Sequence, residues 1–452
     1  MGDEERPFGL MSRRDALKAM LLGATGLSFA GRIPAFAQAP AAAAPAGAPQ
    51  ARAKAVIQVW LWGGPPHTDT FDPKPDAGYD YTGPLNGVIP TNVPGIELGD
   101  SLPQLAQQAD KYSIIRSMTH GINGHETAAY ITQTGRRPGG RLVYPALGAL
   151  VSKFLGYDGG YTGLVPPYIV LTQPQGRFDE AGFLGPRYKP FATGGDPNAQ
   201  RFVVEGVVAG NITDERQAAR RELLHSLDTL RHDMPDHPQA VKLDTTEAKA
   251  YDMILGDAGK LFDLSTEDTE VRAAYGRNTF GQSCLMARRL VEAGVPWVTI
   301  NYGGWDTHKQ HFETMRWKLP QMDTAMAMLL QDLSDHGLLD STIVWWSGEF
   351  GRTPRVAWEA PWNGGRHHFG QCFSAVLAGG GFKGGQVVGA SDATGEHVAE
   401  RPVYPIDVLG SICELLGIDP EGALANPRGQ DLRVMSTDDQ PADAVGRLRE
   451  IM

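Results

Sequence analysis

Four short apolar runs, each followed by a loop of glycine and polar residues, constrain the fold of this chain most strongly. Residues 55–62 lead into Gly63-Gly64-Pro65-Pro66, and residues 296–301 lead into an elbow at Gly303-Gly304. Runs that are short and apolar at nearly every position are typical of strands that are buried on both faces of a sheet. The remaining two runs are residues 111–116 and 342–346.

Helical patterns lie between these runs. Apolar residues recur at helical spacing over residues 322–333, with Pro320 before them and Gly337 after them, and residues 406–416 are predicted to form another helix. Strands that alternate with helices predict an α/β fold with a mostly parallel central sheet and helices on both faces. Such sheets bind ligands at the carboxyl ends of their strands, which is where the polar loops of this chain lie.

We expect residues 54–452 to form a single α/β domain with two insertions. Residues 157–193 are rich in glycine, proline and aromatic residues and are expected to form an ordered excursion over the sheet. Residues 213–264 are charged and favour helix, which is typical of surface helices or a cap.

The first 37 residues have the pattern of an export signal. Arg13-Arg14 precede an apolar run, and Ala35-Phe36-Ala37 offers a cleavage site of the Ala-x-Ala type. This pattern resembles a twin-arginine signal, with Ala16 where that signal usually has phenylalanine. Residues 38–53, rich in alanine and proline, are expected to be a linker. We therefore expect a periplasmic or secreted protein.

The formal net charge of −11 argues against a dedicated nucleic-acid-binding protein, because such a protein normally presents a basic face. Local clusters of arginine could still bind a small anion. The three cysteines are far apart in the sequence, form no Cys-x-x-Cys pair and are expected to be buried. After the signal, no apolar run is long enough to predict a transmembrane segment, and the sequence leaves the oligomeric state open.

The glycine elbow leads directly to Asp306, His308 and His311. Asp306 and His308 are two residues apart, so they project to the same side while the chain is extended. Thr307 and Gln310 have the spacing of a capping box, which predicts that a helix begins here and brings His311 near the strand end. A carboxylate with imidazoles suits zinc, manganese or iron. The alternative is a capped helix with surface histidines.

The loop after the first apolar run carries further potential ligands. His67, Asp69 and Asp72 could each bind a metal ion, and we favour Asp69 over Asp72 because Asp72 precedes Pro73 and could only shape the turn. Thr70 could be a hydroxyl nucleophile or a simple turn former.

The loop after residues 342–346 contributes Glu349, Arg352, His367 and His368. Glu349 follows an apolar strand, where an unpaired charge is costly, so we expect it to have a metal ion or a cation such as Arg352 as its partner. Adjacent histidines point in different directions, so we expect one of His367 and His368 to be a ligand.

A fourth motif contains His125, Thr127 and Arg136 among glycines. Glycines allow close approach of the backbone to a ligand, and the arginines of this motif could clamp an oxyanion through two hydrogen bonds. A solvated loop followed by a helix is the alternative.

In their order along the chain, these motifs resemble the DUF1501 family, a group of exported bacterial proteins related to the sulfatase and alkaline phosphatase superfamily. The resemblance covers most of the chain after the linker and implies the α/β fold of that superfamily, although a fold does not fix a reaction. The segments that carry it are 63–72, 115–118, 134–135, 181–185, 303–308, 348–354 and 365–368.

The superfamily holds two metal ions at the carboxyl edge of its sheet, so the resemblance implies one or two divalent ions, zinc, manganese or similar. Where the superfamily commonly has Asp-His-Gly, this chain has Glu349-Phe350-Gly351, so one imidazole ligand is missing there. The ligands that the resemblance implies are Asp69, Asp306 with His308 or His311, Glu349, and His367 or His368.

The nucleophile is a second departure. His125 occupies the position of the modified cysteine of sulfatases, so no formylglycine can form there. Thr127 or Thr70 could act instead, or a metal-bound hydroxide could attack directly. Arg136 or Arg352 could stabilise the developing charge. We therefore expect an exported metal-dependent hydrolase of phosphate or sulfate esters, which acts on a small anionic ester or an anionic glycan. The alternative is a non-catalytic relative that binds an anionic ligand or a cell-surface partner.

Overall fold

The computed structural model describes residues 49–174, 180–204, 216, 219, 222–223 and 257–452, and these residues belong to one unit, Ala46–Met452. The expected signal peptide, most of the expected linker and most of residues 213–264 lie outside the described residues. All three cysteines are buried, as expected, and each is free. Among the described helices, none is long and apolar enough to cross a membrane.

A sheet of eight strands forms the centre of the fold, in the order β12-β4-β11-β8-β1-β7-β5-β6. β11 runs antiparallel to both of its neighbours, whereas the other paired strands of this sheet run parallel. The expected mostly parallel sheet is confirmed, and the four apolar runs form β1, β4, β7 and β8. The strands are β1 (Ala55–Trp60), β4 (Tyr112–Met118), β5 (Tyr168–Leu171), β6 (Phe191–Ala192), β7 (Trp297–Asn301), β8 (Thr342–Ser347), β11 (Phe373–Ala378) and β12 (Gln386–Val388).

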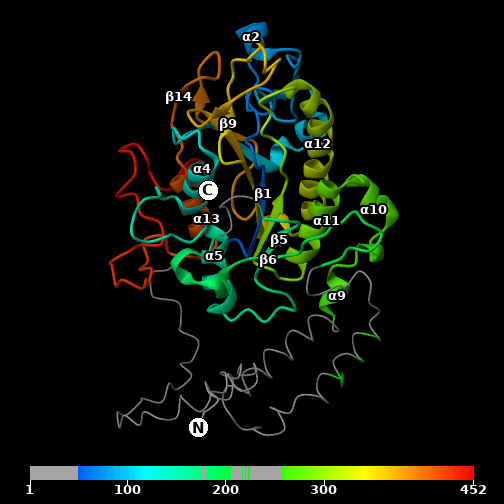
Figure 1. The fold of residues 1–452 in the computed structure, drawn as a ribbon, viewed down its shortest axis with the longest axis vertical. Helices are drawn as coiled ribbons and strands as arrows, with labels where there is room; N and C mark the ends of the chain where they lie inside the picture. Colours follow the sequence, from blue (N-terminus) through cyan, green and yellow to red (C-terminus); the bar gives the residue numbers. More distant parts are fainter. Residues whose placement is uncertain (1–48, 175–179, 205–215, 217–218, 220–221, 224–256) are drawn as a thin grey trace, which may run out of the picture. The chain divides into compact units, whose positions relative to one another are not determined.

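Helices cover both faces of the sheet (Figure 1). Alternate residues of β1 face opposite ways: Ile57 and Val59 belong to one core, and Val56 and Trp60 belong to the other. A strand that is buried on both faces must be apolar at nearly every position. α3 (Pro103–Ala106), α11 (Thr279–Glu292) and α12 (His311–Asp335) pack on the first face, and α4 (His125–Thr134), α5 (Leu147–Val151) and α13 (Pro405–Leu415) pack on the second.

Shorter elements complete the described part of the chain. The short helices are α2 (Tyr79–Thr82), α9 (Ala258–Leu261) and α10 (Thr269–Ala274), with a π-helical stretch at Ser152–Tyr157. The short strands are β2 (Val88–Pro90), β3 (Glu97–Gly99), β9 (Gly351–Arg352), β10 (His368–Phe369), β13 (Ala390–Ser391) and β14 (Val398–Glu400). Single 3-10 turns lie at Pro75–Ala77, Ala109–Lys111, Gly182–Leu184, Pro186–Tyr188, Leu264–Thr266, Leu339–Ser341 and Arg449–Ile451.

α12 is longer than the apolar spacing predicted. It begins at His311 and contains Pro320, which was expected to precede the helix. Pro320 is exposed, so water can solvate the Arg316 carbonyl that loses its intrahelical hydrogen bond. The predicted capping box is wrong, because Gln310 is a left-handed N-cap without a side-chain hydrogen bond and the Thr307 hydroxyl contacts the His311 ring instead.

Part of residues 157–193 differs from the expected excursion over the sheet. β5 pairs with β7, and β6 pairs with β5, so both strands extend the sheet at its edge. All four residues of β5 are buried. In a run of four apolar residues, periodicity cannot distinguish a buried strand from a segment of buried helix.

Candidate metal site

Three neighbouring strands bring the loops of interest to one edge of the sheet. The last residues of β7 and β8 both pair with Trp60, the last residue of β1. Beyond the strands, the elbow after β7 continues beside the chain after β1, because Tyr302 N donates to Trp60 O at 2.9 Å and Trp305 N donates to Trp62 O at 3.2 Å. The loops therefore meet at the carboxyl edge, where parallel sheets bind their ligands.

Glycine at position 63 lets two of these loops touch. Gly63 has a φ of +111°, and a Cβ atom built on it would lie 2.2 Å from the backbone nitrogen of Asp306. A side chain there would push the loops apart. Asp306 is consequently held against the loop that follows β1.

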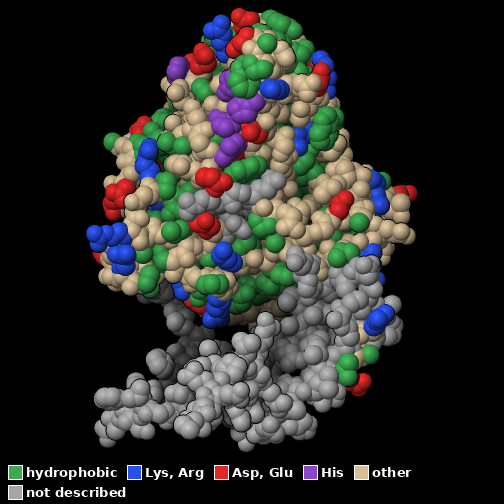
Figure 2. Space-filling view, viewed as in Figure 1, with side chains coloured by type: hydrophobic (Ala, Val, Ile, Leu, Met, Phe, Trp, Pro, Cys, Tyr) green, Lys and Arg blue, Asp and Glu red, His purple; other side chains and the backbone are tan. Residues whose placement is uncertain are grey.

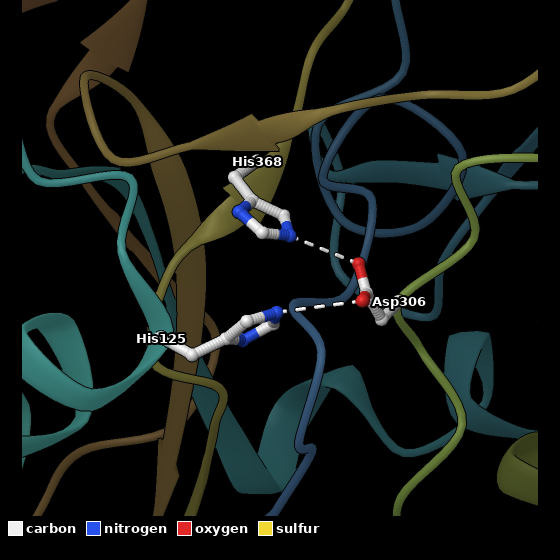
Figure 3. Close-up of side chains that lie close together, drawn as sticks. All are labelled: His125, Asp306 and His368. Carbon is white, nitrogen blue, oxygen red and sulfur yellow. Dashed lines mark hydrogen bonds and ion pairs between the residues drawn. The ribbon is translucent and has the colours of Figure 1, made fainter.

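Asp306, His125 and His368 point toward one another at this edge (Figure 3). One ligand atom of each lies within 4.8 Å of the other two. Asp306 Oδ1 is 3.0 Å from His368 Nε2, and Asp306 Oδ2 is 3.4 Å from His125 Nε2. His125 begins α4 and His368 begins β10, so the fold gathers these residues from distant parts of the sequence.

Two more histidines join this group. His308 Nε2 lies 2.9 Å from His368 Nε2 and 3.0 Å from Asp306 Oδ1, while His308 Nδ1 lies 2.9 Å from His367 Nδ1. Histidine side chains form a stripe on the surface in Figure 2, and the Asp306 side chain is 40% exposed. A ligand from solvent can therefore reach the group. We call His125, Asp306, His308, His367 and His368 the histidine cluster.

Glu349 orients His125 from the interior. Its Oε1 lies 2.6 Å from His125 Nδ1 and accepts a hydrogen bond of 2.9 Å from Gly63 N. Burial raises the pKa of Glu349. Hydrogen bonds to Asp306 and Glu349 raise the pKa of His125 to about 9. Without a metal ion His125 is therefore protonated at neutral pH, and a bound ion would have to replace that proton.

A backbone carbonyl orients His368 in the same way. His368 Nδ1 lies 2.7 Å from Asn123 O, which can only accept, so this nitrogen carries the proton. With Nδ1 protonated on both rings, neutral His125 and His368 direct their Nε2 lone pairs at Asp306. Lone pairs that face a carboxylate repel it unless a proton or a metal ion lies between them. In the metal-free protein the second proton of His125 lies in that place, and a divalent ion could replace it.

Three atoms of the histidine cluster lie slightly closer together than the ligands of a bound zinc ion would. His308 Nε2, His368 Nε2 and Asp306 Oδ1 form a triangle with sides of 2.9, 3.0 and 3.0 Å. Nitrogen and oxygen ligands about 2.0–2.2 Å from a tetrahedral zinc ion lie roughly 3.3–3.6 Å apart, so these three atoms would have to separate by a few tenths of an ångström around an ion. The buried Oε2 of Glu349 has no hydrogen-bond partner among the described residues, which is a further sign of a missing cation or proton nearby. Imidazoles with one carboxylate suit zinc, manganese or iron.

Arg352 fixes Asp306 from the interior. Its side chain is 0% exposed, and Nη1 donates to Asp306 Oδ1 at 2.8 Å and to Gly63 O at 2.9 Å. Burial alone would raise the pKa of Asp306, but hydrogen bonds from His125 and His368 and the charge of Arg352 lower it. The sequence suggested Arg352 as the partner of Glu349 or as a group that stabilises developing charge, and in the structure its guanidinium donates to Asp306.

Asp69 and His311 lie together in the interior. His311 Nε2 is 2.6 Å from Asp69 Oδ2, Arg366 Nη2 donates to Asp69 Oδ1 at 2.9 Å, and all three side chains are 0% exposed. His311 Nδ1 is 2.6 Å from Thr307 Oγ1. Burial lowers the pKa of His311 to about 4, so the ring is neutral. We call Asp69, Thr307, His311 and Arg366 the buried network.

This network separates two of the expected metal ligands from the others. Among the described residues, the ligand atoms gathered around Asp306 include neither Asp69 nor His311. Thr307, between Asp306 and His308 in the sequence, is 5% exposed and faces the interior. The buried network thus holds the segment that carries two members of the histidine cluster.

The two candidate nucleophiles have different surroundings. Thr70 is fully buried, and its hydroxyl donates to Pro66 O at 2.7 Å, which corresponds to the turn-forming alternative. Thr127 is half-buried in the first turn of α4, two residues after His125. Of the two, Thr127 lies closer in sequence to a member of the histidine cluster and remains partly accessible.

Arg136 contacts a different part of the fold. It is 6% exposed, its Nη2 donates to Arg433 O at 3.1 Å, and its guanidinium lies 5.0 Å from the ring centre of Tyr144. These contacts direct Arg136 to the C-terminal segment rather than to the histidine cluster.

One tryptophan borders the histidine cluster, and a stacked aromatic pair includes a second tryptophan four residues before it in the sequence. Trp362 contacts the rings of His367 and His308, with centroid distances of 4.7 and 6.0 Å. Trp358 stacks on Tyr79 at 5.1 Å and 7°, and Tyr79 is 63% exposed. We call Tyr79, Trp358 and Trp362 the aromatic edge. The aromatic edge was not predicted from the sequence, although two tryptophans four residues apart just before His367 were a signal.

Other residues of the site were also missed. His125 was expected at the position of a nucleophile, and the structure places it among the potential ligands. Arg366 directly precedes the two histidines of its motif, yet its pairing with Asp69 spans 297 residues, and no local pattern reveals a contact of that range.

Comparison with models of known protein families identifies the family of this chain. The model of a family described as a protein of unknown function, DUF1501, matches residues 53–445. No curated protein matches the chain. Structural neighbours are sulfatases and members of the alkaline phosphatase superfamily.

Three of these solved structures illustrate the similarity. A protein of the alkaline phosphatase superfamily from Vibrio parahaemolyticus has 11% identity and a TM-score of 0.39, covering 82% of this chain and 69% of that one. The sulfatase PsFucS1 from Pseudoalteromonas has 15% identity and a TM-score of 0.34, covering 81% and 68%. The C-terminal periplasmic domain of EptC from Escherichia coli, in complex with zinc, has 10% identity and a TM-score of 0.33, covering 85% and 89%. These likenesses are distant, and the reaction has to be inferred from the side chains of this chain.

Proposed function

The chain belongs to the DUF1501 family, and we propose that it is a metal-dependent hydrolase of phosphate or sulfate esters. The observation that carries this proposal is the convergence of two imidazole Nε2 atoms on one carboxylate. Glu349 and Asn123 fix the Nδ1 protons of His125 and His368, so both Nε2 atoms face the Asp306 carboxylate at an exposed edge of the sheet.

We propose one divalent ion, zinc, manganese or similar, held by His125, Asp306, His308 and His368. A second ion is not part of the proposal, because Asp69 and His311 bond to each other in the buried network. The other proposed roles concern orientation: Glu349 holds His125, and Arg352 holds Asp306. Hydrogen bonds from neighbouring residues to metal ligands fix the geometry of those ligands and tune their basicity.

A divalent ion in such a site polarises an ester oxygen and lowers the pKa of water. The residues of the chain supply the remaining elements of hydrolysis. Thr127 is the proposed nucleophile if attack is covalent, because its hydroxyl is partly accessible in the first turn of α4. His367 is half-buried at the outer side of the cluster, and burial lowers its pKa, so its neutral ring can accept a proton at neutral pH.

The proposed substrate is a small anionic ester or an anionic glycan. The aromatic edge supports a substrate with a ring-shaped alcohol part, because Trp362 borders the histidine cluster and Tyr79 presents an exposed ring close to Trp358. Aromatic side chains offer large contact areas to ligands at a small loss of conformational entropy.

We also propose export through the twin-arginine route, on the basis of Arg13-Arg14 and the apolar run that follows. A protein exported in the folded state would reach the periplasm or the exterior with its metal ion already bound. Protein purified from its own export route is therefore the material in which metal content should be measured.

Turnover by metal-stripped and reloaded protein tests the proposal. Chelated wild type, reloaded with zinc or manganese, should hydrolyse 4-nitrophenyl phosphate or 4-nitrophenyl sulfate, and the chelated form should not. His368→Ala should remove turnover, whereas His336→Ala, an exposed histidine at the end of α12, should retain it. Absence of turnover with every ion, in protein that binds the ion, would contradict the hydrolase.

One observation favours a second function, metal-dependent binding without catalysis. Phe350 stands where the superfamily has an imidazole, and its fully buried ring lies 5.0 Å from the His125 ring and 4.6 Å from the His368 ring. A ring that cannot bind a metal ion thus packs against two ligands. Tight binding of one ion together with binding, but no hydrolysis, of anionic esters would support this alternative.

A further inference from the structure

Lys318 contacts the elbow that delivers Asp306 to the histidine cluster. It lies in the second turn of α12, is 3% exposed, and its Nζ donates to Gly303 O at 2.7 Å. We propose that Lys318 is a positioning residue, which holds the elbow at residues 302–305 and thereby sets where the Asp306 carboxylate lies. This inference rests on the metal site proposed above.

Aromatic rings enclose the Lys318 ammonium. Nζ lies 3.8 Å from the ring centre of Tyr302, 4.9 Å from that of Trp305 and 5.3 Å from that of Trp317. Two of these rings belong to the elbow itself. Rings at such distances attract a cation, most strongly where water is excluded. Lys318 therefore binds the elbow through one carbonyl and two ring faces at once.

No other obvious stabilising role explains this lysine. Burial lowers its pKa to about 7, whereas the Gly303 carbonyl and the rings favour the protonated form. Among the described residues, no carboxylate forms an ion pair with it. Lys318 lies between Met315 and Met322 on the buried face of α12, where an apolar side chain would avoid the cost of burying an ammonium.

The elbow needs a support on this side. Gly304 has a φ of +84°, and a Cβ atom on it would lie 3.4 Å from Lys318 Nζ, so the backbone passes directly over the ammonium. On its other side, the elbow bonds to the chain after β1 through Trp305 N. Asp306 is the next residue. Metal ligands have to be held within about 0.5 Å of their productive position, so a small movement of the elbow would weaken the site.

Cobalt binding by three proteins tests the proposal. Lys318→Met removes the ammonium and keeps an unbranched side chain, and Arg316→Met makes the same type of change at an exposed position of α12. Metal-free Lys318→Met should melt at or above the wild-type temperature, yet bind Co²⁺ roughly 10-fold more weakly and with a shifted d–d absorption spectrum. Arg316→Met should match the wild type in both. A Lys318→Met protein with the wild-type affinity and spectrum would overturn the proposal.

The outcomes separate this inference from the proposed function. If the wild type binds no Co²⁺, the metal site itself is wrong, and the role of Lys318 falls with it. If the wild type and Lys318→Met bind equally, only the role of Lys318 is wrong. Lys318→Gln, which keeps a hydrogen-bond donor for Gly303 O, should show intermediate affinity. If neither variant folds, Lys318 is a residue that the fold requires, and the proposal is also overturned.

Discussion

The contact of 2.6 Å between His125 Nδ1 and Glu349 Oε1 determines which nitrogen of His125 faces the exposed edge of the sheet. It joins the first residue of α4 to the loop after β8, 224 residues away in the sequence. Because Glu349 is fully buried and also accepts from Gly63 N, its carboxylate has little freedom to move. The orientation of His125 is thus built into the interior.

Replacing Glu349 should weaken metal binding without removing any ligand from the cluster. Glu349→Gln keeps the shape but loses the charge that fixes the His125 tautomer, and changes of this kind typically cost about 10- to 100-fold in metal affinity. Competition titration with a zinc chelator measures the change. Glu126→Gln, at an exposed position of α4, is the matched control and should bind zinc as the wild type does. Equal affinities for all three proteins would show that Glu349 does not act on the site.

Stability of the metal-free protein should depend on pH through His125. The folded-state pKa of His125 is raised to about 9 from the ordinary 6.5 by Asp306 and Glu349. The stabilisation from these contacts is therefore complete below pH 6.5 and is lost as the pH rises through 9. Urea unfolding in the presence of a chelator should show that wild type exceeds His125→Gln in stability at pH 6, and that this difference shrinks by pH 9.5. If the stability difference between the two proteins stayed constant or grew over this pH range, the raised pKa of His125 would be refuted.

Breaking the buried network should destabilise the whole fold. Asp69→Asn leaves the Arg366 guanidinium, which is 0% exposed, without its carboxylate, and an uncompensated buried charge costs about 3–5 kcal/mol. Chemical denaturation gives the free energy of unfolding. Asp335→Asn, at an exposed position of α12, should change it by less than about 0.5 kcal/mol. If Asp69→Asn changed the free energy of unfolding only slightly, groups other than Asp69 would have to stabilise the charge of Arg366.

Substitution in the aromatic edge should affect substrate binding more than chemistry. Trp362→Ala removes a ring that borders the cluster without supplying a ligand. With an ester of a ring-shaped alcohol, KM should rise several-fold while kcat stays near the wild-type value. The lost ring contact would stabilise the bound substrate and the transition state equally. With a small alkyl ester, the two proteins should be similar. A loss in kcat with an unchanged KM would indicate that Trp362 supports the cluster itself.

The strands could be predicted from the sequence because their signal is local. β1, β7 and β8 are apolar at nearly every position, since helices cover both sides of the sheet. β5 is also apolar at every position, but its four residues are too few for a clear prediction. The start of α12 was missed because a proline inside a helical pattern normally ends the helix, whereas Pro320 is exposed and tolerated.

The sequence predicted that four side chains gather at one edge of the sheet, because each follows the end of a strand or belongs to a loop at that edge. These side chains are Asp306, His308, Glu349 and His368. The sorting of side chains into the histidine cluster and the buried network could not. Asp69 contacts His311 across 242 residues, and only the packed interior decides that this pair excludes Asp69 from the cluster. Lys318 falls on the apolar face of α12, but this signal appears only once the true start of the helix is known.

The most direct test of the central claim is an anomalous difference map, recorded at the zinc absorption edge, from crystals of the wild-type protein soaked with zinc. We predict one strong peak per chain, within about 2.0–2.2 Å of Asp306 and of the Nε2 atoms of at least two of His125, His308 and His368. A map with no peak at the histidine cluster, or with its peak between Asp69 and His311, would contradict the metal site proposed here.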